Sequence, residues 1–166
     1  MTSPGNSYRL ATVAVLTAVL VTVAPYDSAP AGDANATGWL DGLIGSWAGR
    51  ADTTPVGPRP YDMTFKRLAD GRIAAMANPG RAIHHWWFSQ ARGRLHLTFL
   101  TTFQGNREPQ PFLPATFESG KAIFTTRRAD RLSVHVLLRH RRLAIDVLRH
   151  GRLHVAIRLN RTRTGD

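Results

Sequence analysis

The sequence predicts an all-β fold: an antiparallel up-and-down meander that closes into a roughly ten-stranded barrel behind a short helical turn. Two observations support this prediction. Turn signals containing Gly or Asp recur at short intervals, for example at 69–72, 91–94 and 149–152, and these residues suit tight hairpins. Between the turns, apolar and polar residues alternate with the period of two that is typical of strands with one buried face.

The clearest strands lie near the C-terminus. Apolar residues take every second position in 132–136, 143–147 and 153–159, which predicts three meandering strands. Earlier strands are expected near 46–53, 61–68, 72–77, 82–89, 94–103, 112–118 and 121–127. Apolar residues at helical spacing predict a single helical turn at 38–44. A set of antiparallel strands leaves two exposed edges unless the sheet closes, which favours a barrel over the alternative, a two-sheet sandwich.

The first 36 residues have the pattern of a secretory signal peptide and linker. Arg9 precedes an apolar stretch from Leu10 to Val23, and an A-x-A site ends at Ala36. This stretch is shorter than the roughly 20 residues that a membrane-spanning helix needs. We therefore expect cleavage after Ala36, one domain at 37–166 and a secreted or periplasmic location, the alternative being an uncleaved anchor.

The sequence lacks the motifs of several classes of function. The chain has no cysteine, which excludes disulfides, thiolate catalysis and zinc–cysteine sites. No H-E-x-x-H spacing is present, so no metal site is expected. The motifs G-x-S-x-G and S-x-x-K are also missing, and the sequence favours a binding protein over an enzyme. Aromatic residues cluster in 61–124 whereas most arginines lie from residue 127 onward, so no nucleic-acid partner is expected.

Positive charge is concentrated towards the C-terminus. The formal net charge is +11, and eleven arginines lie between Arg127 and Arg163. The large excess of arginine over lysine favours the interpretation that arginine serves throughout this chain as the ordinary solvated charge. The alternative is a polyanionic partner, such as nucleic acid, lipopolysaccharide or an anionic membrane surface, with which a weak contact is possible.

The segment 43–49, Leu-Ile-Gly-Ser-Trp-Ala-Gly, resembles the G-x-W that opens the first strand of lipocalin-like and fatty-acid-binding-like barrels, the calycins. The resemblance is to the exported bacterial type, and it implies that Trp47 closes one end of the barrel under an arginine from the last strand. Parity supplies that arginine: if the odd-numbered apolar residues of 153–159 face inward, Arg161 shares their face. We therefore expect Gly45, Trp47 and Arg161 to form the closed end, with a guanidinium–indole contact worth ~0.5–2 kcal/mol.

The segment 82–88, Ala-Ile-His-His-Trp-Trp-Phe, is the most unusual stretch of the chain. On a strand, His84, Trp86 and Phe88 share one face and the odd-numbered residues share the other. We expect the first of these faces to point into the barrel. One histidine would then lie among aromatic rings, either as a hydrogen-bonded core residue or as the polar group of a binding site.

The leading hypothesis is therefore an exported protein that binds a small hydrophobic molecule without a cofactor. Its cavity is expected to be lined by His84, Trp86, Phe88, Leu97, Phe99, Val134, Val136, Ile145, Val155 and Ile157. A first alternative is a barrel that uses His84 or His85 to bind haem, as the nitrobindin-like branch of these barrels would imply, or for isomerase-like chemistry. A second is a basic surface protein that docks on anionic components of the cell envelope.

Overall fold

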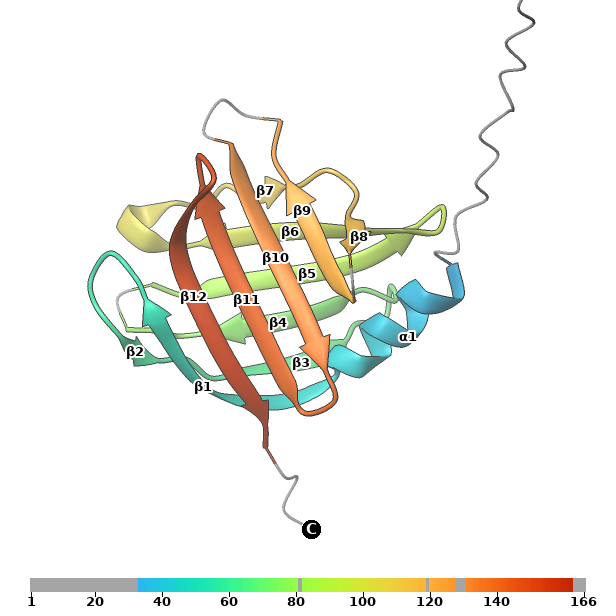
Figure 1. The fold of residues 1–166 in the computed structure, drawn as a ribbon, viewed down its shortest axis with the longest axis horizontal. Helices are drawn as coiled ribbons and strands as arrows, with labels where there is room; N and C mark the ends of the chain where they lie inside the picture. The colour runs from blue at the N-terminus through green and yellow to red at the C-terminus, as the bar shows by residue number, and fades with distance from the viewer. Residues whose placement is uncertain (1–32, 81, 119, 128–130, 163–166) are drawn as a thin grey trace, which may run out of the picture.

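The computed structural model describes residues 33–80, 82–118, 120–127 and 131–162. One α-helix and twelve strands form in these residues (Figure 1). The elements are α1 (Asp33–Leu43), β1 (Gly45–Thr53), β2 (Arg59–Pro60), β3 (Met63–Arg67), β4 (Ile73–Ala77), β5 (His84–Ala91), β6 (Arg94–Thr101), β7 (Gln110–Pro111), β8 (Thr116–Glu118), β9 (Lys121–Thr125), β10 (Leu132–Arg139), β11 (Arg142–Arg149) and β12 (Arg152–Arg161). In this part of the chain no helix has the length and apolar character required to cross a membrane.

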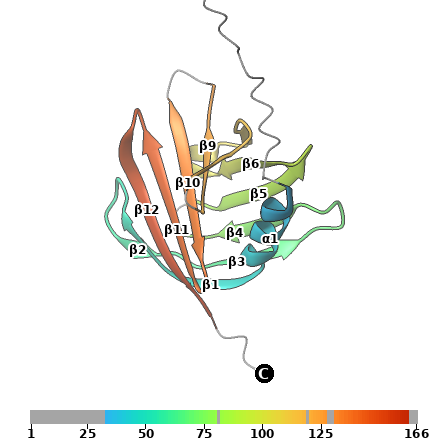
Figure 2. The ribbon, with the colours of Figure 1, turned by 45° about the vertical axis from the view of Figure 1, so that its right-hand side comes forward.

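All strands belong to one antiparallel sheet. Its order is β7-β6-β5-β4-β3-β1-β12-β11-β10-β9-β8, and β2 pairs with β1 outside this path. The sheet curls so that β3 to β6 lie behind β9 to β12, and β1 and β12 join the two halves (Figures 1 and 2). We refer to β3–β6 as the aromatic layer and to β9–β12 as the arginine layer.

The predicted all-β meander is confirmed, but the predicted closure into a ten-stranded barrel is wrong. The two edge strands, β7 and β8, do not pair with each other in the described residues, so the sheet is an open half-barrel. Both edge strands are very short, with two and three residues. Strands of this length offer too few backbone groups for a closing ladder.

The connection at 112–115 partly fills the gap between the two layers. The backbone N–H groups of Phe112 and Ala115 donate to carbonyls of β6 at 2.9 and 2.8 Å. The N–H of Leu113 donates to the carbonyl of Thr125 in β9 at 2.8 Å. Single hydrogen bonds therefore link β6 and β9 where a closed barrel would have a continuous ladder.

The N-terminal helix is longer than the predicted turn. It begins at Asp33, five residues before the expected start at Gly38, and ends at Leu43. The expected cleavage point after Ala36 therefore falls within α1, where Ala36 is buried. Cleavage remains a prediction, and the apolar stretch expected to direct it, residues 10–23, lies outside the described residues.

The core fills the space between the two layers. Phe88 of β5 lies at its centre, with ring centroids 6.1 Å from Phe65 and 5.8 Å from Phe124. Helix α1 covers one end of this core: Trp39 packs edge-on against Phe88 at 5.9 Å, and Leu43 is fully buried. Edge-on aromatic pairs add about 0.5–1.5 kcal/mol each to the effect of burial.

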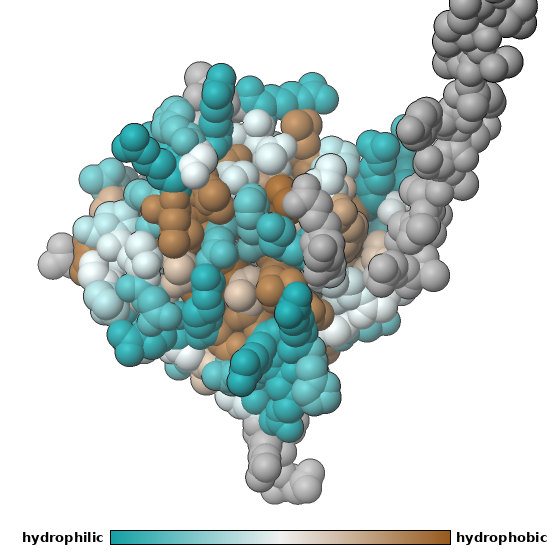
Figure 3. All heavy atoms as spheres, in the orientation of Figure 1, coloured by the Kyte–Doolittle hydropathy of each residue, from teal (hydrophilic) through white to brown (hydrophobic). Residues whose placement is uncertain are grey.

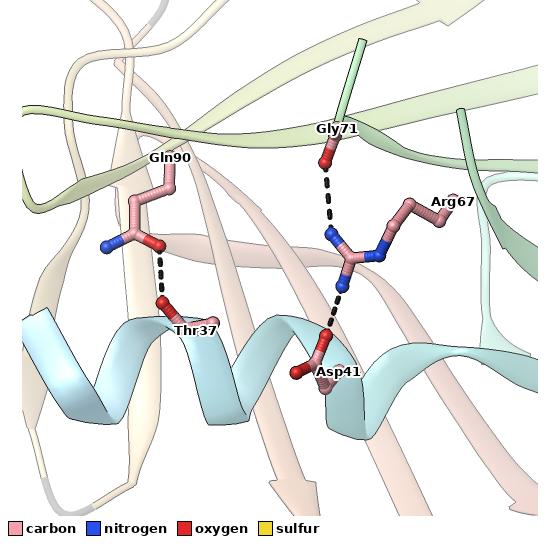
Figure 4. A network of polar contacts seen from close by, with 5 residues as sticks. All are labelled: Thr37, Asp41, Arg67, Gly71 and Gln90. Atoms are coloured by element: carbon pink, nitrogen blue, oxygen red, sulfur yellow. Dashed lines mark hydrogen bonds and ion pairs between the residues drawn. The ribbon is translucent and has the colours of Figure 1, made fainter. Parts of the chain in front are cut away.

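Polar contacts hold the outer side of α1 against the aromatic layer (Figure 4). The hydroxyl of Thr37 donates to the side-chain oxygen of Gln90 at 2.9 Å. Arg67 pairs with Asp41 and also donates to the carbonyl of Gly71. These side chains are exposed, so they orient the helix while burial supplies most of its attachment.

Candidate functional site

The end of the half-barrel next to α1 is closed by Trp47 and Arg161. These residues face each other in the β1–β12 register, and the Cζ atom of Arg161 lies 4.7 Å from the centre of the indole ring. Trp47 Nε1 donates to the carbonyl of Leu43 at 2.8 Å, and Arg161 donates to the carbonyl of Gly42. The C-terminal carbonyls of α1, which lack partners within the helix, are thus bound by the two closing side chains.

Gly45 allows the chain to turn from α1 into β1. Its φ is +125°, a conformation that side chains rarely adopt. The three residues expected at the closed end are therefore brought together, and their contacts are structural: they join helix, first strand and last strand.

Seven of the ten residues expected to line a cavity are packed in the core. They are Trp86, Phe88, Leu97, Val134, Val136, Ile145 and Ile157, and none is more than 1% exposed. At this degree of burial a water-sized probe does not reach their side chains. The face of β5 that points inward is the predicted one. However, the space beside the middle of this strand is filled by the protein's own side chains.

The other three, His84, Phe99 and Val155, are half-buried. The rings of His84 and Phe99 lie 5.5 Å apart, and Val155 pairs with Val147 across β11 and β12. His84 begins β5, at the end opposite to Gln90, whose side chain contacts α1, and Val155 lies towards the end of β12 opposite to Arg161. Leu132 and Val147 are likewise partly buried against the core. We call these five residues the open-end rim.

A chain of hydrogen bonds runs from the core to this rim. Trp86 Nε1 donates to the hydroxyl oxygen of Tyr61 at 3.2 Å, and that hydroxyl lies 2.9 Å from Nδ1 of His84. The Tyr61 hydroxyl already accepts the indole proton, so its own proton points to Nδ1, the acceptor within reach. We infer from this that His84 carries its proton on Nε2, since that tautomer gives the buried hydroxyl proton an acceptor.

Burial keeps both titratable groups of this chain neutral. Desolvation, with a smaller effect from the neighbouring charge of His85, lowers the pKa of His84 to about 4. Burial raises the pKa of Tyr61 well above its usual value, although the hydrogen bond from Trp86 opposes the rise. In the described residues no hydrogen bond reaches Nε2 of His84. The rim therefore carries a neutral N–H donor.

His85 and Trp87 face the opposite side of β5. Their rings stack at 5.4 Å with an interplanar angle of 5°. They border an open groove of about 610 Å³ on the outer face of the sheet. The groove is also lined by Ser46, Trp47, Ala48, Asp62, Met63, Thr64, Lys66, Leu68, Ala74, Ala75, Met76 and Thr162.

The two histidines proposed as alternative haem ligands thus belong to different surfaces. Only His84 faces the interior, and Nδ1 of its ring is engaged with Tyr61, so Nε2 is the nitrogen available to a ligand. No cluster of three or more histidine or carboxylate side chains that could hold a metal ion occurs within the described residues.

Sequence reasoning did not identify Tyr61. Its alternation with Met63 and Phe65 could have placed it on an inner face. Its role depends on His84, which lies 23 positions away and meets it across β3, β4 and β5. The pairing of the two residues therefore required the register of the folded sheet.

No model of a known protein family, no curated protein and no solved structure matches this chain.

Proposed function

We propose that this chain is a lipocalin-like binding protein that holds a small hydrophobic molecule at its open-end rim. The observation that carries the proposal is the half-buried imidazole of His84, which contacts the Tyr61 hydroxyl through Nδ1 and the ring of Phe99. Apolar walls with a few well-placed polar groups are the usual composition of small-molecule sites. Trp86 and the other buried residues belong to the packed core next to this site.

The hydrogen-bond chain defines the polar part of the ligand. Because His84 presents a donor, the ligand needs an acceptor, such as a carbonyl, ether or carboxylate oxygen. Because the rim is formed by Phe99, Leu132, Val147 and Val155, the rest of the ligand is apolar. In this proposal the ligand lies at the mouth of the half-barrel, above the packed centre.

The other expectations are retained as parts of the proposal. The N-terminal pattern of Arg9, the apolar stretch and Ala36 supports export to a secreted or periplasmic location. The G-x-W at Gly45 and Trp47, covered by Arg161, supports the calycin-like assignment. No cofactor is part of the proposed mechanism.

The test uses a neighbouring pair of variants on opposite faces of β5. A fluorescent fatty acid and its methyl ester serve as probes, because both carry an acyl chain and acceptor oxygens. His84→Phe removes the N–H donor and should weaken binding of either probe roughly fivefold, the effect of one hydrogen bond of about 1 kcal/mol. His85→Phe, the matched control, should leave both affinities unchanged.

The outer groove at His85 and Trp87 is the second candidate, favoured by its volume and stacked rings. If His85→Phe and Trp87→Ala weaken the probes while His84→Phe does not, the ligand site lies there. If none of these variants alters binding, the proposal of a ligand site on β5 is wrong.

A further inference from the structure

The outer face of the arginine layer combines an apolar centre with arginines at its ends. The apolar centre is formed by Ile123, Leu137, Ala144, Leu148 and Leu153, and His135, Asp146 and Arg158 lie among them. One end carries Arg139, Arg141 and Arg142, and the connection between β9 and β10 at the other end carries Arg127 and Arg131. We call this surface the basic face. Figure 3 shows hydrophobic patches on this side of the molecule with hydrophilic atoms between and around them.

The sheet register produces this arrangement. Arg139 pairs with Arg142, and one step inward Leu137 pairs with Ala144. Towards the other end Leu148 pairs with Leu153, beside the hairpin that begins at Arg149. Alternate residues of each strand share a face, so Leu137, Ala144, Leu148 and Leu153 project from the same outer side as Arg139 and Arg142. Arg149 and Arg152, which are next in sequence to Leu148 and Leu153, have the parity of the inner side.

The basic face has little negative charge to balance it. Between residues 121 and 162, the acidic residue that the structure describes is Asp146, and it pairs with Arg158 at 2.6 Å. The five arginines at the two ends are all exposed. The apolar centre is partly open as well, with Leu153 49% exposed.

We propose that the basic face docks on an anionic phospholipid bilayer. Arginines attract the negative surface of such a bilayer, and half-exposed leucine and isoleucine side chains can enter the boundary between headgroups and acyl chains. A single-stranded nucleic acid would instead require aromatic rings for base stacking. The sequence has no Phe, Tyr or Trp after Phe124, so the chemistry of this face matches lipid better than nucleic acid.

The experiment measures sedimentation of the full chain with vesicles of phosphatidylcholine alone or with about 30% phosphatidylglycerol, a content that gives a negative surface. The wild-type chain should bind the anionic vesicles much more strongly than the neutral ones. High salt should reduce this difference, because it screens exposed charges. The apolar segment 10–23 is common to all variants, so the comparison between variants isolates the arginines.

Two charge-matched triple variants decide the assignment. R139Q/R141Q/R142Q removes three arginines of the basic face and should lower partitioning onto anionic vesicles on the order of 100-fold. R92Q/R94Q/R107Q removes three exposed arginines located outside the basic face and should change it far less. Leu153→Ser should lower partitioning by a smaller factor without changing net charge.

Three outcomes would overturn the proposal. Equal loss in both triple variants would show that net charge alone attracts the chain to the vesicles. Unchanged binding in R139Q/R141Q/R142Q would place the lipid contact elsewhere. Strong binding to DNA with no preference for anionic vesicles would assign the basic face to nucleic acid.

Discussion

The two layers of the half-barrel share one core but differ in the chemistry of their side chains. The aromatic layer contributes Phe65, Trp86, Phe88 and Phe99, together with the histidine that Tyr61 contacts. The arginine layer contributes mainly aliphatic residues to the core and carries arginines on its outer side. A hydrogen-bonded histidine thus distinguishes the inner side of one layer, and arginines distinguish the outer side of the other.

This difference separates two proposed activities on one sheet. A hydrogen-bond donor inside a curled sheet suits a small ligand, because the surrounding rings exclude water. Arginines outside a sheet remain solvated and suit an extended anionic surface. β1 and β12 are the strands that join the layers. A substitution at their contact should therefore disrupt the arrangement of the two layers most severely.

Trp47→Ala should have the largest effect on stability. It removes a buried indole at the junction of the layers, which should lower the free energy of unfolding by about 3–5 kcal/mol. Arg161→Ala should cost less, and the double variant should cost less than the sum of the two single variants, since their side chains touch. Urea denaturation measures all three. Strict additivity would mean that the guanidinium–indole contact does not contribute.

The pH dependence of stability should report on the aromatic layer. The pKa of His84 is about 4 in the folded protein and 6.5 without the fold, so between these pH values the unfolded chain binds the extra proton. Stability is therefore complete above about pH 6.5 and falls as the pH decreases towards 4. After allowance for partial exposure of the ring, the loss is on the order of 2 kcal/mol.

Denaturation of the wild type and of His84→Gln across this range measures the effect. The variant should lack most of the slope, because its amide does not titrate. Asp70, whose pKa is lowered by hydrogen bonds from Arg72, titrates below this range and leaves the comparison unaffected. A variant with the same slope as the wild type would show that another group causes the loss.

Arg67→Gln should have the smallest effect. The ion pair with Asp41 joins α1 to the aromatic layer, but both side chains are solvent-exposed. Exposed pairs contribute about 0–1 kcal/mol, and salt reduces that further. Thermal denaturation at low and high salt measures it. A loss comparable to that of Trp47→Ala would mean that this contact, and not burial of Trp39 and Leu43, attaches the helix.

The sequence predicted the strands better than it predicted their closure. Segments 132–136, 143–147 and 153–159 showed clean alternation and correspond to β10, β11 and β12. A strand was also predicted over 112–118, but within this segment only β8 forms. The two-residue strands β2 and β7 were not predicted. Closure depends on the length and pairing of such edge strands, which local alternation does not encode.

The sequence predicted which side chains of β5 face inward, but not whether those side chains line a cavity or fill it. Parity correctly separates Trp86 from Trp87, because it depends only on the period of a strand. Whether Trp86 lines a cavity or fills it depends on side chains from other strands, such as Phe99, whose ring lies 4.4 Å away. The hydrogen bond between Tyr61 and His84 is a tertiary contact of the same kind.

The most direct test of the central proposal is the nitrogen NMR spectrum of the two neighbouring histidines, with and without the fatty-acid probe. We expect neutral His84 to carry its proton on Nε2 at pH 7, and its Nε2 resonance to shift when the probe binds, while that of His85 stays constant. A shift at His85 alone would place the ligand in the outer groove. A proton on Nδ1 of His84, with no response to the probe, would contradict a binding site at the open-end rim.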